Sequence, residues 1–223
     1  MTVSLKTLAF AAAVALPAGS ALAGSIDFTD ESTYSFSATQ IDGSVDGVSY
    51  KMTPTPSEGP LTRAKPGPLG IATLVGDNDG IGIVDDEVTA ANESLLLTFT
   101  NTVSLTGLYF LDLFKSASVT SQASEHVFVS VDGGAAIQFG ATEAFSNTGF
   151  GYGEFLGQSL TGQKFLFTAG GNNPGNNDSV GNPDFALARL DVAPVPLPAG
   201  VLLLGGALGG LGFMRRRAAK KAA

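Results

Sequence analysis

The sequence predicts an all-β fold, a two-layer antiparallel β-sandwich of jelly-roll-like form, which occupies residues 24–194 between two apolar ends of the chain. Short apolar runs alternate with polar residues at a period of two, as expected of strands with one buried face. Gly, Asn and Asp clusters separate these runs, and no sustained helical stripe occurs between the two ends. With roughly nine to eleven strands, such a sheet should fold over on itself.

Residues 1–23 have the layout of a secretory signal peptide. Lys6 makes the start of the chain positive, and the apolar run from Leu8 to Leu16 is too short to span a membrane as a helix. Ala21 and Ala23 are the small residues that signal peptidase requires. We therefore expect an N-terminal signal helix that signal peptidase removes, leaving Gly24 as the new N-terminus.

The first apolar runs of the domain predict strands that each bury one face. Asp42-Gly43 and Asp46-Gly47 lie between runs, and Asp-Gly pairs are typical of tight turns. The runs are Ile26 with Phe28, Tyr34 with Phe36, and Val48 with Tyr50 and Met52.

Residues 54–68 hold five prolines together with Arg63 and Lys65. Proline removes backbone donors, so this segment is expected to be a surface loop rather than a central strand. Long loops in compact domains are often functional, which leaves a binding role open beside a plain connection.

Residues 76–87 concentrate acidic side chains. Carboxylates this close repel one another unless water or a cation neutralises them, and Ca²⁺ takes its ligands from carboxylate and carbonyl oxygens. The spacing is not that of an EF-hand, so a structural calcium site and a solvated turn both remain open. The candidate ligands are Asp77, Asp79, Asp85, Asp86 and Glu87.

The most apolar segment, Ser94 to Phe114, predicts a central hairpin with its turn at Asn101 and cover on both faces. A second hairpin is predicted around Asp132-Gly133, because an Asp-Gly pair separates two alternating runs. Phe165 with Phe167 and residues 184–192 complete the predicted strands.

Aromatic residues on a glycine-rich stretch, residues 145–156, form a candidate ligand platform. An aromatic face packs well against the C–H groups of a sugar ring, so Phe150, Tyr152 and Phe155 could contact a polysaccharide. The alternative is that these rings cover the open end of the sandwich.

Composition and charge exclude several function classes for residues 24–194. All 20 acidic residues of the chain but only six basic ones fall there, a net charge of −14 (6 − 20), which disfavours nucleic acid as a partner. The chain has no cysteine, and His126 is its only histidine, so thiolate, zinc and Ser-His-Asp chemistry are not expected. We expect no catalytic residues and no enzyme, although a glycosidase needs only two carboxylates and stays an alternative.

The C-terminal region, residues 195–223, begins with Val195, Pro196, Leu197, Pro198 and Ala199. Residues 199–214 carry no charge and predict a transmembrane helix of roughly 24 Å, short for a bilayer core of about 30 Å. A basic tail, residues 215–223, follows and would stay on the cytoplasmic side. Its stop-transfer cluster is Arg215, Arg216 and Arg217.

The order of this motif, span and arginine cluster resembles the VPLPA-type C-terminal sorting signals, relatives of the PEP-CTERM signals, of bacterial exosortase substrates. The resemblance covers about the last thirty residues of the chain. It implies a membrane intermediate, a cut near the prolines by an exosortase-type enzyme, and release of the domain to the cell surface or extracellular matrix. There the domain could bind exopolysaccharide. The alternative is a β-domain that stays tethered to the membrane.

Overall fold

The computed structural model describes residues 23–55, 59–63, 67, 70–90, 92–115, 124–144, 150–171, 183–195 and 209. Leu22–Leu197 forms one compact unit, which is the domain described below. The predicted signal helix, the arginine cluster and, apart from Gly209, the predicted transmembrane span lie outside the described residues. Within the described residues, no helix is long and apolar enough to cross a membrane.

The described part of the domain is nearly all β and contains a large antiparallel sheet, which confirms the all-β part of the predicted fold and is consistent with a sandwich. Thirteen strands are seen there, against the roughly nine to eleven expected from the spacing of the apolar runs. They are β1 (Gly24–Asp27), β2 (Tyr34–Ser37), β3 (Gln40–Val45), β4 (Val48–Pro54), β5 (Leu61–Thr62), β6 (Gly82–Ile83), β7 (Ser94–Leu111), β8 (Phe114–Lys115), β9 (Glu125–Val131), β10 (Ile137–Gly140), β11 (Glu143–Ala144), β12 (Gly153–Gly171) and β13 (Ala186–Pro194).

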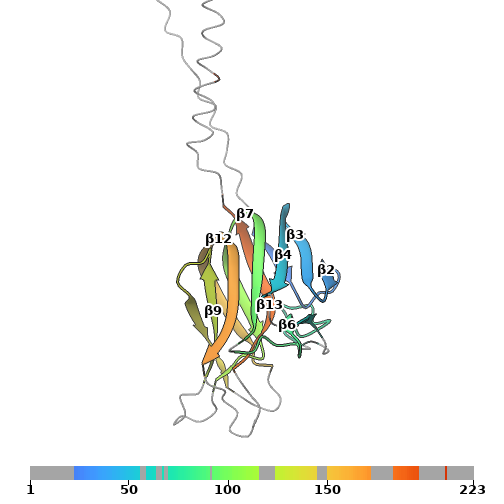
Figure 1. The fold of residues 1–223 in the computed structure, drawn as a ribbon, viewed down its shortest axis with the longest axis vertical. Coiled ribbons are helices and arrows are strands. Elements are labelled where there is room, and N and C mark those ends of the chain that lie inside the picture. The colour runs from blue at the N-terminus through green and yellow to red at the C-terminus, as the bar shows by residue number, and fades with distance from the viewer. Residues whose placement is uncertain are drawn as a thin grey trace, which may run out of the picture. The chain divides into compact units, whose positions relative to one another are not determined.

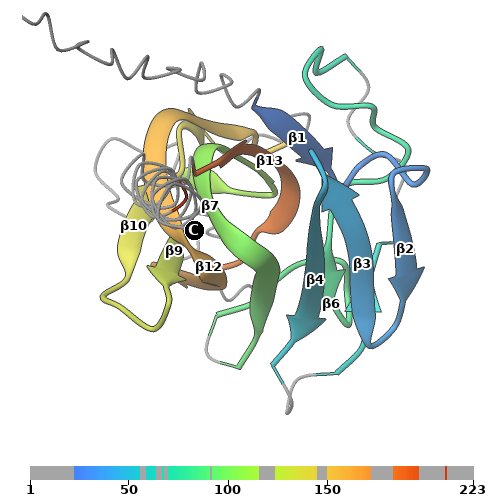
Figure 2. The same cartoon turned by 90° about the horizontal axis from the view of Figure 1, so that it is seen from above.

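Two long antiparallel strands, β7 and β12, organise the sheet (Figure 1). The first half of β7 pairs with β4 and with residues 164–168 of β12, whereas its second half pairs with β13 and with residues 153–162 of β12. Between the halves the pairing jumps from Gly162 opposite Val103 to Lys164 opposite Thr98. The strand pair therefore bends at this point, and the curvature of β7 is visible in Figure 2.

The bend separates two groups of strands, which we call the long layer and the short layer. The long layer runs β10, β9, second half of β12, first half of β7, β4, β3 and β2, and the labelled strands follow this order across Figure 1. The short layer contains the first half of β12, the second half of β7, β13 and β1. Both layers contain part of β7 and part of β12, because these two strands pass from one layer to the other.

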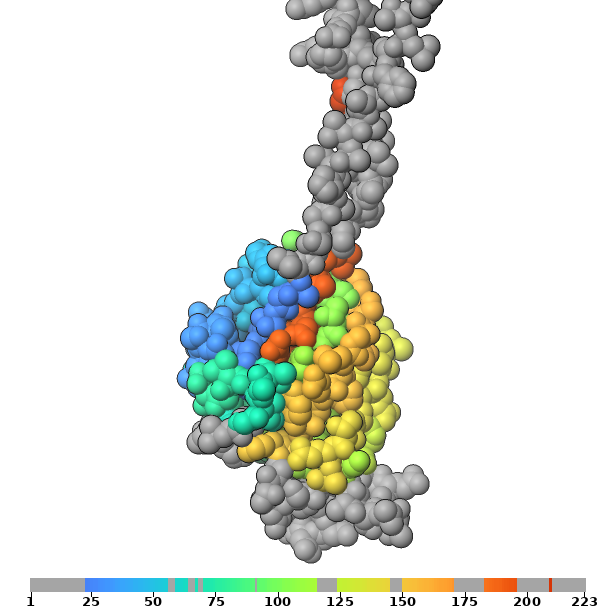
Figure 3. Space-filling view, turned by 180° about the vertical axis from the view of Figure 1, so that it is seen from behind, coloured from blue at the N-terminus to red at the C-terminus, as the bar shows by residue number. Residues whose placement is uncertain are grey.

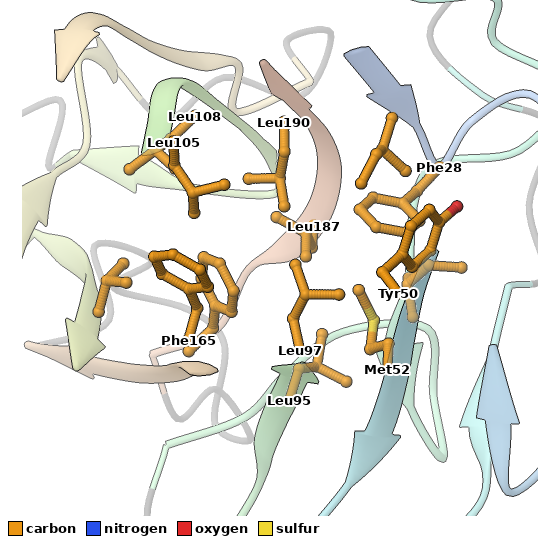
Figure 4. Close-up of a cluster of buried hydrophobic side chains, with 14 of the residues drawn as sticks. Phe28, Tyr50, Met52, Leu95, Leu97, Leu105, Leu108, Phe165, Leu187 and Leu190 are labelled. Atoms are coloured by element: carbon orange, nitrogen blue, oxygen red, sulfur yellow. The ribbon is translucent and has the colours of Figure 1, made fainter. Parts of the chain in front are cut away.

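One hydrophobic core lies between these layers, and both halves of β7 contribute to it. In Figure 4, Leu105, Leu108 and Leu190 of the short layer approach the core from the side opposite to Leu95 and Phe165 of the long layer. Alternate residues along each strand point inward, so the period-two pattern of the sequence is the physical origin of this core.

The predicted hairpin with a turn at Asn101 is wrong, because Ser94–Leu111 is a single strand. Its two halves do not pair with each other; each pairs with β12 instead. Residues 153–156, expected in a glycine-rich loop, are likewise the start of β12, which also includes Phe165 and Phe167.

Two of the three predicted Asp-Gly turns are confirmed. Asp46-Gly47 joins β3 to β4 and Asp132-Gly133 lies between β9 and β10, with positive φ at both residues of each pair, as a type I′ turn requires. The third prediction is wrong, because Asp42-Gly43 lies inside β3. There the Tyr50 ring occupies the space where a side chain at residue 43 would stand, so glycine is needed for packing rather than for a turn.

The two ends of the described domain meet on paired strands. Gly24 of β1 lies opposite Val192 of β13 in an antiparallel pair, two residues before the end of β13 at Pro194. The first and last strands therefore begin and end on the same side of the domain. The opposite side, which we call the far end, is where β7 and β12 reach Leu111 and Gly153.

The alternation along β7 gives a direct test of this arrangement. Leu97 is fully buried between the layers, whereas Leu96 is on the outer face and only half-buried. We expect Leu97→Ala to lower the free energy of unfolding by about 3 kcal/mol and Leu96→Ala by roughly 1 kcal/mol. Urea unfolding of both variants measures the difference, and equal losses would contradict the assigned register.

Candidate functional site

The far end of the domain gathers several carboxyl groups, with Glu125 at their centre. Glu125 begins β9 and is only 2% exposed. Its Oε2 accepts a 2.6 Å hydrogen bond from the backbone N–H of Phe114, and its backbone carbonyl accepts one from Ala141. The side chain thus ties the start of β8 to β9.

The pKa of Glu125 is raised to about 8, first by burial and then by the nearby carboxyl groups of Glu87 and Asp112, while the hydrogen bond from Phe114 lowers it. Burial also raises the pKa of Asp184 well above its usual range, and Glu125 and Asp112 act in the same direction. These effects show that the four carboxyl groups interact, although they come from distant parts of the chain.

Sequence reasoning did not single out Glu125 or Asp184. For Glu125 a signal was present, because it shares the inward parity of Val127, Val129 and Val131. A carboxyl group on the apolar side of a strand predicts a buried group with a raised pKa. Asp184 carries no such local signal, because its carboxyl neighbours are all distant in sequence.

The five candidate calcium ligands have different surroundings. The backbone N–H of Asp77 donates to the carbonyl of Thr29, after β1, and Asp79 is buried. The backbone N–H of Asp86 donates to Oγ1 of Thr62 on β5, and Asp85 is exposed. Glu87 lies near the carboxyl group of Glu125.

No three or more His, Asp or Glu side chains are arranged to hold a metal ion within the part of the chain that the structure describes. Calcium binding remains a prediction.

The turn through residues 83–87 is conformationally strained. Val84 has a φ of 65°, in a region that β-branched residues rarely adopt, and Asp86 has a φ of 74°, which Asp tolerates more readily. The turn is held by a hydrogen bond from the Val84 N–H to Pro60 and by one from the Ile83 N–H to Glu87. These bonds keep the backbone in this conformation although Val84 itself is 57% exposed.

The three predicted platform residues do not share one surface. Phe155 packs into the main core against Phe110 and Phe139, with ring centroids 6.0 and 5.3 Å away. Tyr152 packs instead beside Tyr109 in a second, smaller cluster, at a centroid distance of 6.5 Å. Phe150 is 43% exposed.

Residues 70–76 form a strap across the outer face of the short layer, where Figure 3 shows the segment around residue 75 against β13 and β7. Arg189 of β13 donates from Nη1 to the carbonyl of Thr73 (2.7 Å), and Oγ1 of Thr73 is 2.8 Å from the hydroxyl of Tyr152. Leu74 is buried beside Tyr109. The strap is therefore packed onto the sheet by polar and apolar contacts together.

Arg189 is the centre of this second network. Its Nε and Nη2 donate to Oδ1 of Asp191, and its guanidinium lies 5.2 Å from the centroid of the Tyr109 ring. The Tyr109 hydroxyl donates to Oδ2 of Asp191 (2.7 Å), and burial together with this bond raises the pKa of Tyr109. The polar groups of this network are used within the domain, which indicates a structural role.

Of the predicted processing residues, the structure describes those next to the first and last strands of the domain. Ala23 and Val195 are exposed, and Gly24 begins β1. His126 is half-buried on β9, with its ring centroid 6.4 Å from that of Phe128. The other predicted residues, Ala21, Pro196, Leu197, Pro198, Ala199, Arg215, Arg216 and Arg217, lie outside the described residues.

Comparison with known proteins adds no family: no protein-family model, no curated protein sequence and no solved structure matches this chain.

The raised pKa of Glu125 predicts a specific pH dependence. The folded state keeps the Glu125 proton up to about pH 8, whereas a free Glu side chain releases it near pH 4.5. The contribution of protonated Glu125 to the stability of the fold is therefore complete below pH 4.5 and is lost as the pH rises to 8. We expect Glu125→Gln, which keeps an acceptor for Phe114, to raise the free energy of unfolding by on the order of 2 kcal/mol at pH 9 and to leave it nearly unchanged at pH 4.

Urea unfolding between pH 4 and 9 measures this difference. Glu154→Gln is the matched control, because Glu154 is exposed and lacks the burial that acts on Glu125. A Glu125→Gln effect that is constant across this range would contradict the assigned burial.

The strained turn predicts an unusual stabilising substitution. Val84→Gly should raise the free energy of unfolding by about 1 kcal/mol, because glycine adopts positive φ without cost and an exposed valine loses little packing. Val75 is equally exposed, at 57%, but is not among the residues with positive φ, so Val75→Gly should be neutral or destabilising. Thermal unfolding of the two variants distinguishes them, and destabilisation by both would rule out strain at Val84.

Proposed function

We propose that this chain is an exported cell-surface or extracellular-matrix protein whose β-domain is not catalytic. In this proposal signal peptidase removes residues 1–23, the C-terminal helix holds an intermediate in the membrane, and an exosortase-type enzyme cuts near Pro196 and Pro198. The motif, span and arginine cluster of residues 195–217 are the basis for the sorting step.

The observation that carries the proposal is the pairing of β1 with β13. The predicted signal cleavage leaves Gly24, which is the first residue of β1, and the predicted sorting motif begins at Val195, directly after β13 ends at Pro194. Both cuts would therefore remove chain outside the sheet and leave every described strand intact.

We also infer that the domain is a two-layer sandwich of jelly-roll-like form. Support comes from the bend shared by β7 and β12 and from the single core that residues of both layers enclose. Such folds serve many functions, so the fold alone does not select among them.

The enzyme alternative would have to use the carboxyl groups at the far end. A raised pKa, as at Glu125, is typical of a general acid in glycosidases. However, Glu125 is only 2% exposed and its Oε2 already holds the Phe114 N–H, so its contacts favour a structural role.

Intact mass spectrometry of the protein recovered from cell envelope and culture medium tests the proposal. We expect a species that lacks residues 1–23 and everything beyond the Pro196–Pro198 region. The double variant Pro196→Ala and Pro198→Ala should retain its C-terminus, because the motif read by the enzyme is altered. Pro60→Ala, at an exposed proline of the domain, is the control and should be processed normally.

A wild-type mass that extends through Ala223 would overturn the sorting step and leave a membrane-tethered β-domain.

A further inference from the structure

The outer face of the long layer carries ordered rows of side chains from neighbouring strands. One row places Gln138, Phe128, Thr168 and Ser94 side by side on β10, β9, β12 and β7. The next row places Ser130, Leu166, Leu96 and Thr53 side by side on β9, β12, β7 and β4. Inward neighbours on the same strands fill the core, so these side chains lie on the other face of the sheet, where Ser94 alone among the eight is buried and lies 3.1 Å from the Thr55 hydroxyl.

These two rows contain no charged residue, although the domain they belong to has a net charge of −14 (6 − 20). Charges are found in the following row, where Lys164 and Lys51 flank Thr98. Lys51 is 3.9 Å from a carboxylate oxygen of Asp42 on β3. Surfaces of soluble proteins ordinarily carry interspersed charged side chains, so an uncharged face in so acidic a domain needs an explanation.

The centre of this face is apolar and its border is rich in hydroxyl and amide groups. Phe128, Leu166 and Leu96 are half-buried and retain exposed surface. The Phe128 ring leans over Gly170, at the place that a side chain would fill at any other residue. The ring therefore lies along the sheet surface, with Thr168 and Gln138 as its cross-strand neighbours.

We propose that this face binds an uncharged polysaccharide, an inference that rests on the extracellular location proposed above. Aromatic and aliphatic groups can pack against the C–H groups of sugar rings, while Thr168 and Gln138 can exchange hydrogen bonds with sugar hydroxyls. The Ser130 hydroxyl donates to the carbonyl of Gly134 (2.7 Å) and can still accept a hydrogen bond. Four adjacent strands at about 4.8 Å spacing give a surface roughly 14 Å wide from β9 to β4, enough for a short stretch of a polysaccharide chain.

Charge favours an uncharged ligand over an acidic one. An acidic polysaccharide would approach against the net negative charge of the domain. Lys51 and Lys164 at the border offset little of this repulsion, because Lys51 already has the Asp42 carboxylate as a neighbour. A neutral chain meets no such opposition on the two uncharged rows.

Affinity electrophoresis of the full chain in mild detergent, through gels that contain a soluble neutral glucan or alginate, tests the proposal. We expect retardation by the neutral glucan and not by alginate. Thr168→Glu, which places a carboxylate in the uncharged rows, and Phe128→Ala, which removes the ring, should each weaken binding at least tenfold. Thr161→Glu is the matched control, because residue 161 is exposed on the same strand but belongs to the short layer.

Circular dichroism and thermal unfolding establish that each variant is folded before it is compared. If neutral glucans retard the wild-type chain and retard Thr168→Glu to the same extent, the proposal is overturned. Equal weakening of binding by Thr168→Glu and Thr161→Glu would also overturn it. Absence of retardation by any neutral glucan, or self-association of the chain through this face in sedimentation measurements, would also overturn it. None of these outcomes changes the processing measured by mass spectrometry, so the two proposals fail separately.

Discussion

The pairing of β7 with β12 is the constraint on which the rest of the domain depends. Both strands are long enough to cross the domain, bend and continue, and they remain partners on both sides of the bend. Each layer is then completed by strands added to this pair, namely β4 and β9 in the long layer and β13 in the short layer. Because both strands pass from one layer into the other, the two layers are covalently connected.

The far end buries carboxyl groups, which disfavours their charged form. Glu125, Asp184, Glu87 and Asp112 influence one another there, while the rest of the described domain keeps most of its carboxylates in solvent or in local hydrogen bonds, as Asp27 does with Thr29. The loss of stability with rising pH that follows from Glu125 is opposite to the behaviour of an ordinary paired carboxylate. The acidic groups of the domain therefore differ in how their ionisation changes its free energy of unfolding.

Features that depend on near neighbours were predictable from the sequence, and those that depend on distant partners were not. The turns at Asp46-Gly47 and Asp132-Gly133 need only two residues with positive φ between alternating runs. The apolar run of residues 94–111 is compatible with a hairpin or with one bent strand, and the choice depends on β12, far along the chain.

The same limit applies to the candidate sites. Phe155 and Tyr152 look alike as aromatic residues among glycines, but Phe155, on β12, packs into the core, whereas Tyr152, one residue before β12, packs into the second cluster. The uncharged outer face could have been found only by combining residues of five strands, which requires the registers of the sheet.

The pairing of the first strand with the last has a consequence for how the domain forms. β13 lies between β1 and β7, so neither of these strands has its full set of partners until nearly the whole domain sequence is present. Contacts between such distant segments give a high contact order, which slows folding because loop closure must precede the gain from pairing. A chain that crosses a membrane from its N-terminus would therefore hold an open sheet edge until its final strand emerges, and completion of translocation and completion of folding would coincide.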